Sequence, residues 1–192
     1  MQDPFSLFQL WYDEERRTST NQLPAACCLS TVGLDGCPNA RFVSLKAIEE
    51  GAFIVTGSWN SRKGIELKNH PQAALTFWWD QSLRQVRIQG EVTPISNESA
   101  KLYFSQRSSS AKYISSHFNQ GQEIGSLADI KKIYSNFNSE QCKKSIDRPK
   151  DWGGFSIQPL RVEFMTFKMD RLHERRLFEM KNKQWVMHFL EP

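Results

Sequence analysis

WGGF at residues 152–155 and RLHER at residues 171–175 enclose the stretch that decides the fold. The two glycines after Trp152 carry no side chain, so the backbone can approach a flat group closely there. Between the motifs, LRVEFMTF at residues 160–167 alternates for much of its length, as a half-buried strand does. Continued alternation predicts that one face carries three basic residues, Arg171, His173 and Arg175. Three neighbouring basic groups favour an anion or an electron-rich ring between them, and a solvated strand edge is the alternative interpretation.

Turn residues divide the rest of the chain into short strands and helices. The expected strands are 25–32, 39–48, 52–56, 72–79, 83–95, 154–158, 160–168, 175–180 and 184–190, with Gly90 as a bend or bulge. The expected helices are 1–20, 61–69, 96–106, 109–117 and 126–144, the last opened by a Ser126-x-x-Asp129 capping pattern. Short connections between consecutive strands predict an antiparallel meander. The fold class is therefore α+β, a closed or partly closed barrel with peripheral helices.

The length and charge of the chain limit its domain organisation and its partners. Its 192 residues suffice for one domain with a sizeable core. We expect a single domain over 1–192, with an N-terminal helix in 1–20, a helical insertion in 96–144 and C-terminal strands in 152–192. A net charge of only +4 argues against a basic nucleic-acid-binding protein and favours local cationic clusters for small anions.

The cysteine pattern indicates the compartment. No C-x-x-C pair and no metal-like spacing with histidine occurs among Cys27, Cys28, Cys37 and Cys142. We therefore expect free thiols in a reducing compartment, and no metal site. No secretory signal and no apolar run of ~20 residues is visible in the sequence, which predicts a soluble cytoplasmic protein without a membrane partner.

The two motifs of the opening stretch also carry a resemblance that covers nearly the whole chain. WGGF followed by RLHxR resembles the C-terminal signature of the pyridoxamine 5′-phosphate oxidase family, which are FMN-dependent flavoproteins. The resemblance implies an FMN-binding split barrel and a homodimer with flavin sites at the subunit interface. It implies a small-molecule substrate, a phosphorylated B6 vitamer, and no nucleic acid.

Ser61-Arg62-Lys63 is the most informative local motif. If Ser61 caps a helix, two cations lie in its first turn, where the helix dipole disfavours them and free backbone N–H groups point outward. A bound phosphate would satisfy both, whereas two exposed side chains reaching water are the alternative. The resemblance implies that Arg62 and Lys63 hold the phosphate of FMN.

Residues 41–46 form a strand with charged ends, which by itself is compatible with an ordinary core strand. By resemblance to the family's R-x-V-x-L-K strand, Arg41 reaches the FMN phosphate and Lys46 contacts both flavin and substrate phosphate. The resemblance implies further flavin contacts from Phe42, Val43, Ser44, Thr56, Gly57, Gln85, Gln120, Gly121, Trp152 and Arg175. Gln85 suits the pyrimidine edge because an amide offers both a donor and an acceptor. Gln120 and Trp152 are expected from the subunit opposite to Arg62 and Lys63.

Tyr103 and Arg107 match the family's Y-F-x-x-R, and their spacing of four residues predicts one helical face that can grip a phosphate. An aromatic–cation pair on a helix surface is the alternative. The family's next phosphate ligand is a serine that falls on Ala111, and Ser110 can substitute if the loop shifts. The resemblance places Arg171 and His173 against the substrate ring, as residues for orientation and proton management.

Two further departures concern the substrate. Typical family members carry an N-terminal segment that covers the substrate, and this chain begins almost at the family's first helix. The family's closing R-L-x-P is Phe189-Leu190-Glu191-Pro192 here.

The sequence is therefore interpreted as an FMN-dependent oxidase that converts pyridoxamine or pyridoxine 5′-phosphate to pyridoxal 5′-phosphate, with O2 giving H2O2. Alternatives are a same-fold oxidase acting on another aromatic ring, as in the phenazine-pathway oxidases, a flavin-binding protein with little turnover, and a basic RNA-binding barrel. The presence of Lys46, Tyr103, Arg107, Arg171 and His173 favours the enzyme, since FMN binding alone does not require them all.

Overall fold

Strict alternation of side chains builds the sheet from the sequence upward. In β4 (Gln72–Trp79) every second side chain is buried, and in the middle of β5 (Arg84–Pro94) the same pattern holds. Such alternation gives each strand one core face and one outer face. The structure is a computed structural model that describes residues 3–18, 23, 25–135, 137 and 146–192. Its other strands are β1 (Ala26–Val32), β2 (Pro38–Glu49), β3 (Ala52–Ser58), β6 (Trp152–Thr166), β7 (Glu174–Lys181) and β8 (Gln184–Leu190).

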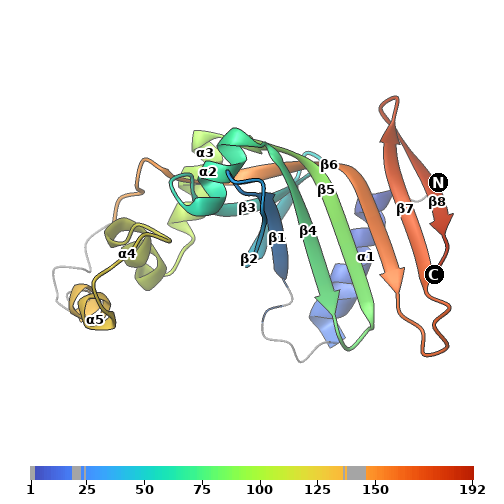
Figure 1. Ribbon diagram of the computed structural model, residues 1–192, viewed down its shortest axis with the longest axis horizontal. Coiled ribbons are helices and arrows are strands. Elements are labelled where there is room, and N and C mark those ends of the chain that lie inside the picture. The colour runs from blue at the N-terminus through green and yellow to red at the C-terminus, as the bar shows by residue number, and fades with distance from the viewer. Residues whose placement is uncertain (1–2, 19–22, 24, 136, 138–145) are drawn as a thin grey trace.

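The eight strands form one antiparallel sheet in the order β3-β2-β1-β4-β5-β6-β7-β8 (Figure 1). An additional β3–β6 pairing closes the first six strands into a barrel and leaves β7 and β8 as an extension of β6. The first half of β6 pairs with β3, with Phe155 opposite Val55, and its second half pairs with β7, with Met165 opposite Arg175. The predicted α+β antiparallel barrel with peripheral helices is confirmed.

β6 differs from the sequence-based expectation of two strands around Pro159. It is one strand from Trp152 to Thr166 with a register shift against β5 between Gln89 and Gly90. Pro159 lies opposite Gly90, and a Cβ on Gly90 would lie 2.1 Å from the carbonyl oxygen of Gln158. Glycine therefore lets the strands approach at a bulge, so the strand continues past a proline that cannot donate to the ladder. The predicted bulge at Gly90 is confirmed.

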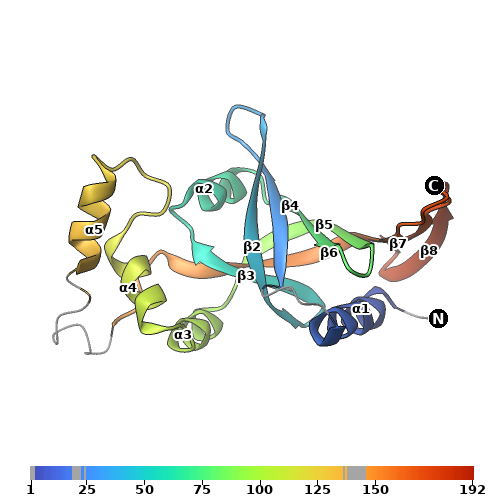
Figure 2. The same ribbon diagram turned by 90° about the horizontal axis from the view of Figure 1, so that it is seen from below.

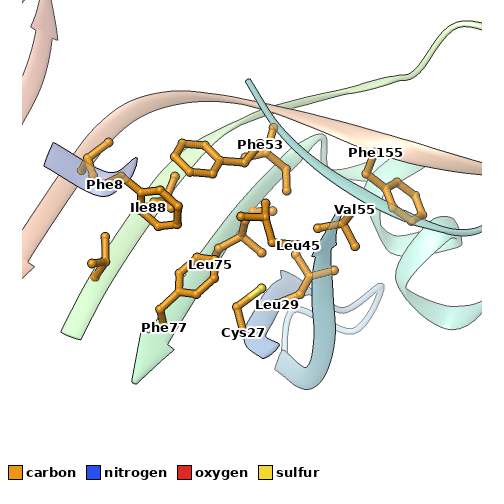
Figure 3. Packing of buried hydrophobic residues seen from close by; sticks show 14 of the residues in the cluster. Phe8, Cys27, Leu29, Leu45, Phe53, Val55, Leu75, Phe77, Ile88 and Phe155 are labelled. Carbon is orange, nitrogen blue, oxygen red and sulfur yellow. The ribbon is translucent and has the colours of Figure 1, made fainter. Parts of the chain in front are cut away.

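The N-terminal helix α1 (Pro4–Thr18) covers the barrel core (Figures 1 and 2). Phe8 is fully buried, and its ring centroid lies 5.1 Å from those of Phe53 and Phe77. Figure 3 shows Phe8 among Cys27, Leu75 and Ile88. Removing a buried phenyl ring of this kind costs ~3–5 kcal/mol, so this aromatic contact fixes the helix on the sheet. The predicted helix is confirmed within Pro4–Thr18, whereas 1–2 and 19–20 lie outside the described residues.

The remaining helices are α2 (Arg62–Asn69), α3 (Asn97–Ser105), α4 (Ser109–His117) and α5 (Leu127–Ser135). Side-chain caps start three of them: Ser96, Ser108 and Ser126 accept from Ser99 N, Ala111 N and Asp129 N. The predicted capping pattern at Ser126 is thus confirmed, while positions 136 and 138–144 of that expected helix lie outside the described residues. Both views place α4 and α5 at the end of the molecule opposite to β7 and β8. In the described part of the chain, no helix combines the length and apolarity that a membrane crossing requires.

Candidate active site

A cavity of about 760 Å³ lies at the end of the barrel where β2, β3, the start of α2 and the end of α4 meet. The predicted flavin contacts that line it are Phe42, Val43, Ser44, Thr56, Gly57, Lys63, Gln120 and Trp152. Gly121 lines a second cavity of about 380 Å³ together with Arg62, and Gln122 lines both. The structure thus brings most of the predicted flavin residues to one place.

Two aromatic side chains give the cavity flat surfaces. Phe42 in β2 is 81% exposed although it is a large apolar residue, because β2 points it away from the core. Trp152 is buried, with its ring centroid 5.0 Å from that of Phe104 and the guanidinium of Arg107 at 5.0 Å from its ring. An exposed phenyl ring beside a backbone edge suits a flat ligand.

Lys63 is the buried cation of the cavity. Its Nζ donates to Ser61 Oγ at 3.1 Å and to Gln120 Oε1 at 3.0 Å. Burial, together with the nearby charge of Arg41, lowers the pKa of Lys63 to about 8. A Cβ on Gly57 would lie 3.1 Å from Lys63 Cε, so the glycine makes room for the lysine. A desolvated ammonium with two neutral partners favours an anion.

Ser61 stands at the N-cap of α2 as predicted, but its side chain makes no cap hydrogen bond. Its hydroxyl instead donates to the carbonyl oxygen of Ser58 at 2.6 Å and accepts from Lys63. Ser61 is therefore the N-cap residue by its backbone position, while its hydroxyl bonds Lys63 and Ser58 instead of the first turn. The first-turn N–H groups of α2 receive no side-chain acceptor from Ser61, which leaves that helix end suited to an anion.

Arg41 and Arg62 converge on the carboxylate of Glu66. Arg41 NH2 lies 3.0 Å from Glu66 Oε2, and Arg62 Nε lies 3.0 Å from Glu66 Oε1. Burial works to raise the pKa of Glu66, but hydrogen bonds from Thr31, Arg62 and Arg41 outweigh it and lower that pKa. The two arginines are therefore held beside an ionised carboxylate, a residue that the sequence analysis did not identify.

One chain supplies Lys63, Gln120 and Trp152 to the same cavity. The expectation that Gln120 and Trp152 come from the opposite subunit is therefore wrong for this cavity. The segment after α4 folds back over the start of α2, and the direct contact between Lys63 Nζ and Gln120 Oε1 holds it there. Asp151 also reaches this cavity and accepts from the Ser58 hydroxyl. Neither Asp151 nor Ser58 belongs to a motif that the sequence analysis singled out.

The predicted phosphate grip of Tyr103 and Arg107 does not assemble in one place. The Tyr103 hydroxyl donates to Glu49 Oε1, and burial and this contact raise the pKa of Tyr103. Lys46 Nζ lies 5.3 Å from the centroid of the Tyr103 ring. Arg107 alone of the three lines the cavity. Tyr103 is therefore turned toward a carboxylate, and Arg107 lies beyond the end of α3 at Ser105, so the expected shared helical face does not form.

Arg107 is held by residues of α4, whereas Ser110, the proposed substitute phosphate ligand, is not hydrogen-bonded to it. Its NH2 group donates to the Ala111 carbonyl at 3.2 Å and to the Ser115 hydroxyl at 3.1 Å, and its Nε has no hydrogen-bond partner among the described residues. Ser110 Oγ lies 3.1 Å from Ser108 Oγ instead. Ala111 and Ser115 stand one helical turn apart on the same face, so the i, i+4 spacing was the sequence signal for Ser115.

Four predicted site residues lie at the opposite end of the barrel, near the β4–β5 turn and the β6–β7 loop (Figure 1). They are Gln85, Arg171, His173 and Arg175. Gln85 and Arg175 flank Met165 on neighbouring strands, and Arg175 pairs with Glu163 at 2.8 Å. His173 Nδ1 accepts from the Lys168 backbone N–H at 3.1 Å. Within one chain these residues do not reach the cavity.

The expectation that Arg171, His173 and Arg175 share one strand face is wrong. β7 begins only at Glu174, and Arg171 lies in the loop with a left-handed φ of 69°. Alternation holds only within a strand, so the loop conformation releases Arg171 from the pattern. Arg171 is exposed and free to meet a group outside its own chain.

Residues 13–133 match the model of a family described as pyridoxamine 5′-phosphate oxidase. Residues 152–192 match the model described as pyridoxine 5′-phosphate oxidase C-terminal dimerisation region. The chain belongs to the pyridoxamine 5′-phosphate oxidase family. A relative named pyridoxine/pyridoxamine 5′-phosphate oxidase, from Leptospira biflexa, is 35% identical over 190 residues, covering 99% of this chain and 89% of the relative. The relative of that name from Legionella pneumophila strain Lens is 36% identical, covering 99% of this chain and 88% of the relative.

Solved structures support the fold. PhzG from Burkholderia lata 383, in complex with tetrahydrophenazine-1-carboxylic acid, is similar with a TM-score of 0.93 at 23% identity, over 100% of this chain and 94% of PhzG. A pyridoxamine 5′-phosphate oxidase-related, FMN-binding protein from Nostoc punctiforme gives a TM-score of 0.80 at 14% identity, over 100% of this chain and 98% of that one. The fold is thus the FMN-binding split barrel that the resemblance implied.

For a member of the pyridoxamine 5′-phosphate oxidase family, the donor set fits a flat ring that carries a phosphate. The Lys63 ammonium lies in the cavity near the start of α2, and aromatic and backbone surfaces of β2, β3 and Trp152 line other parts of it. The family's dimerisation region contains the remote residues Arg171, His173 and Arg175. Among the described residues, no three His, Cys, Asp or Glu side chains gather as metal ligands would.

Proposed function

We propose that this chain is an FMN-dependent oxidase that converts pyridoxamine or pyridoxine 5′-phosphate to pyridoxal 5′-phosphate. Pyridoxine 5′-phosphate and O2 give pyridoxal 5′-phosphate and H2O2, and for the amine one water is also consumed and ammonia released. The observation that carries the proposal is the desolvated Lys63 beside Arg41, at the end of a cavity lined by the exposed ring of Phe42. Membership of the oxidase family supports the reaction class.

The chain's own residues bind and orient FMN, which supplies the two-electron chemistry when bound. Lys63, Arg41 and Arg62 hold the phosphate, with Lys63 and the start of α2 as the central contacts. The strand from Phe42 to Ser44, with Thr56 and Gly57 beside it, lies along the ring. Gln120, Gly121 and Trp152 complete the contacts, since Gln120 and Trp152 line the same cavity as Lys63.

We further propose a homodimer in which a second chain supplies the missing contacts. Gln85, Arg171, His173 and Arg175 lie at the far end of the same chain, so only another copy can bring such residues to the cavity. A two-fold interface presents the same patch on both chains, and two equivalent composite sites result. The family's C-terminal dimerisation region supports this assembly.

In that site the protein positions two rings and excludes water, and little acid–base chemistry is required of it. Arg107 and Lys46 attract the substrate phosphate, with Tyr103 and Ser110 as the remaining proposed contacts. Arg171 and His173 from the second chain orient the substrate ring and hold or release its proton. Arg175 of the second chain would place positive charge near the flavin ring, where it would favour the anionic reduced flavin. We also propose a cytoplasmic location, because Cys27, Cys28 and Cys37 are free thiols.

A second candidate is an FMN oxidase of the same fold that acts on another aromatic ring without a phosphate. The contact between Tyr103 and Glu49 favours it, because a carboxylate beside the proposed phosphate grip repels an anion. Ala111, in place of the family's serine, removes one more phosphate contact. A flavin-binding protein with little turnover is the outcome if neither kind of substrate reacts.

The test uses the full chain loaded with FMN. Anaerobic addition of pyridoxamine 5′-phosphate is expected to bleach the flavin absorption, and air is expected to restore it with equimolar pyridoxal 5′-phosphate and H2O2. Unphosphorylated pyridoxamine and a dihydrophenazine serve as comparison substrates. Bleaching by the dihydrophenazine alone supports the second candidate, and no bleaching by any substrate leaves the non-catalytic flavin protein.

A further inference from the structure

Glu66 in α2 is a buried carboxylate that collects donors from three elements. Its side chain is 2% exposed. Oε2 accepts from the Thr31 hydroxyl of β1 and from Arg41 NH2 of β2 at 3.0 Å. Oε1 accepts from Asn39 Nδ2 at 2.6 Å and from Arg62 Nε at 3.0 Å. Both oxygens are thus fully engaged, and Glu66 joins two strands to the start of α2.

The arginines that Glu66 joins are the two that are proposed to hold the flavin phosphate. Thr31 strengthens this link, because its hydroxyl also accepts from Arg41 NH1. The side chain of Arg41 is 25% exposed and that of Arg62 is 67% exposed, so each keeps a surface for an outside ligand. Without a carboxylate between them, two guanidinium groups in one place would repel each other and turn toward water.

The charges of the cluster also match one kind of anion. Arg41 and Arg62 pair with the anion Glu66, and the charge of Arg41 acts on Lys63, so three cations and one anion leave two net positive charges. A phosphate monoester carries about −1.5 to −2 at pH 7. A ligand of that charge neutralises the cluster, whereas a ligand without a phosphate leaves two positive charges uncompensated, one of them on the buried Lys63.

We propose that Glu66 is a positioning residue of the phosphate site: it holds Arg41 and Arg62 in the orientation that receives a phosphate monoester, and it sets the charge of the cluster. This inference rests on the proposed function, because it assumes that the ligand of the cavity is FMN. Glu66 itself does not touch the ligand. It acts through the two arginines, so its removal impairs recognition of the phosphate and leaves binding of the ring unchanged.

The test compares FMN with riboflavin, which has the same ring and no phosphate. The flavin-free full chain and its Glu66→Gln variant are titrated with each ligand, and flavin fluorescence gives Kd. We expect the variant to bind FMN at least about tenfold more weakly and riboflavin within about twofold of wild type, since one charge-assisted contact is lost or misdirected. The matched control is Glu179→Gln in β7, which removes a carboxylate paired with Arg161 of β6 and Lys181 of β7. This variant is expected to change neither Kd.

A purely structural role predicts a different result. An equal loss of FMN and riboflavin affinity, or FMN affinity that is unchanged or tighter in Glu66→Gln, overturns the inference. If Glu66→Gln does not fold, as judged by circular dichroism, Thr31→Val replaces it, because that variant removes a hydroxyl that bonds both Glu66 and Arg41 while keeping all charges. Thr31→Val is then expected to weaken FMN alone, and an unchanged ratio of the two Kd values overturns the inference.

A second variant shows whether Glu66 acts through the arginines. In an Arg41→Ala, Arg62→Ala background, adding Glu66→Gln is expected to change the FMN Kd by less than about twofold, because the groups it positions are absent. A further large loss of FMN affinity contradicts the inference. Failure of the proposed function is separate: it is seen when the wild-type chain itself binds FMN no better than riboflavin.

Discussion

Lys63 shows how one buried residue gives the cavity a preference for anions. Its ammonium donates to the neutral oxygens of Ser61 and Gln120, and burial lowers its pKa from 10.5 to about 8. A phosphate placed against it would restore the ordinary pKa, so the ligand and the proton bind together. The charge of this residue therefore depends on the ligand.

FMN affinity is expected to fall as pH rises above about 8, because the free protein then releases the Lys63 proton that phosphate binding requires. The fall is expected to approach tenfold per pH unit between about 8 and 10, while riboflavin affinity stays flat over that range. Fluorescence titrations at several pH values measure both. In Lys63→Met the pH dependence is expected to disappear, and a variant that keeps it would contradict this assignment.

Lys63 also affects folding stability in the flavin-free protein. The unfolded chain keeps the lysine proton up to about 10.5, whereas the folded chain releases it at about 8, so the unfolded state binds more protons between these values. The contribution of Lys63 to the unfolding free energy therefore rises with pH in that window. Urea unfolding gives the unfolding free energy of wild type and of Lys63→Met at several pH values, and the difference between the two proteins isolates Lys63. The raised pKa values of Cys27 and Tyr103 lower stability as pH rises, but this effect is the same in both proteins and cancels in the difference. A difference that falls with pH would contradict the assignment.

At the scale of elements, the sequence predicted those features that depend on local pattern. The division of the chain by turn residues predicted strands at 72–79 and 83–95, which are β4 and β5, and the capping pattern at Ser126 predicted the start of α5. The break expected at Pro159 is absent because Gly90 lies opposite it on another strand, and no local pattern reports a cross-strand neighbour. The continuity of β6 past Pro159 therefore depends on its pairing with β5 and not on its local sequence.

Gly90→Ala is expected to destabilise the barrel by ~1–3 kcal/mol, because the new Cβ would lie 2.1 Å from the backbone oxygen of Gln158. Chemical unfolding measures the change. The matched control is Gly153→Ala, also in a paired strand of the barrel, where the nearest atom to a new Cβ lies at 3.7 Å and little loss is expected. Equal stability of the two variants would show that the bulge does not depend on close approach at Gly90.

The site could be predicted only where its residues lie within one short motif. S-R-K at 61–63 and the strand 41–46 led to one end of the cavity, whereas Asp151 and the link from Glu66 to Arg41 escaped notice because the partners are distant in sequence. α3 ends at Ser105, before Arg107, so Tyr103 and Arg107 do not share a helix; Glu49 engages the tyrosine and Ser115 the arginine. Spacing predicts a shared face but not which neighbour each side chain meets.

At the scale of the whole molecule, the residues of the proposed site form two groups that lie at opposite ends of the barrel. The cavity lies near α2 and α4, and the β6–β7 loop with Arg171 lies at the other end (Figures 1 and 2). Large apolar side chains are exposed at both places, with Phe42 at 81%, Met169 at 92% and Leu172 at 65%. Exposed apolar surface of this kind marks an interface, which supports a second copy of the chain as the partner.

Arg171→Ala is expected to lower kcat by at least about tenfold, because the arginine orients the substrate ring, while FMN affinity stays within about twofold. Steady-state turnover and flavin titration measure the two quantities separately. Arg176→Ala on the neighbouring strand β7 is a control for loss of a nearby positive charge. If Arg171→Ala loses FMN affinity together with turnover, the result contradicts the substrate role of Arg171 and indicates that it contacts the flavin.

The central claim is that the cavity of one chain and the β6–β7 loop of another form one oxidase site, and subunit mixing tests it most directly. Lys63→Met and Arg171→Ala, each inactive or nearly so alone, are unfolded together, refolded and assayed for pyridoxal 5′-phosphate at an FMN concentration that saturates wild type but leaves Lys63→Met largely without flavin. Random pairing makes half of the dimers mixed, and each mixed dimer has one intact site of two, so about a quarter of wild-type activity is expected to return. If both groups act within one chain, no pairing restores an intact site, and a mixture no more active than its components contradicts the account.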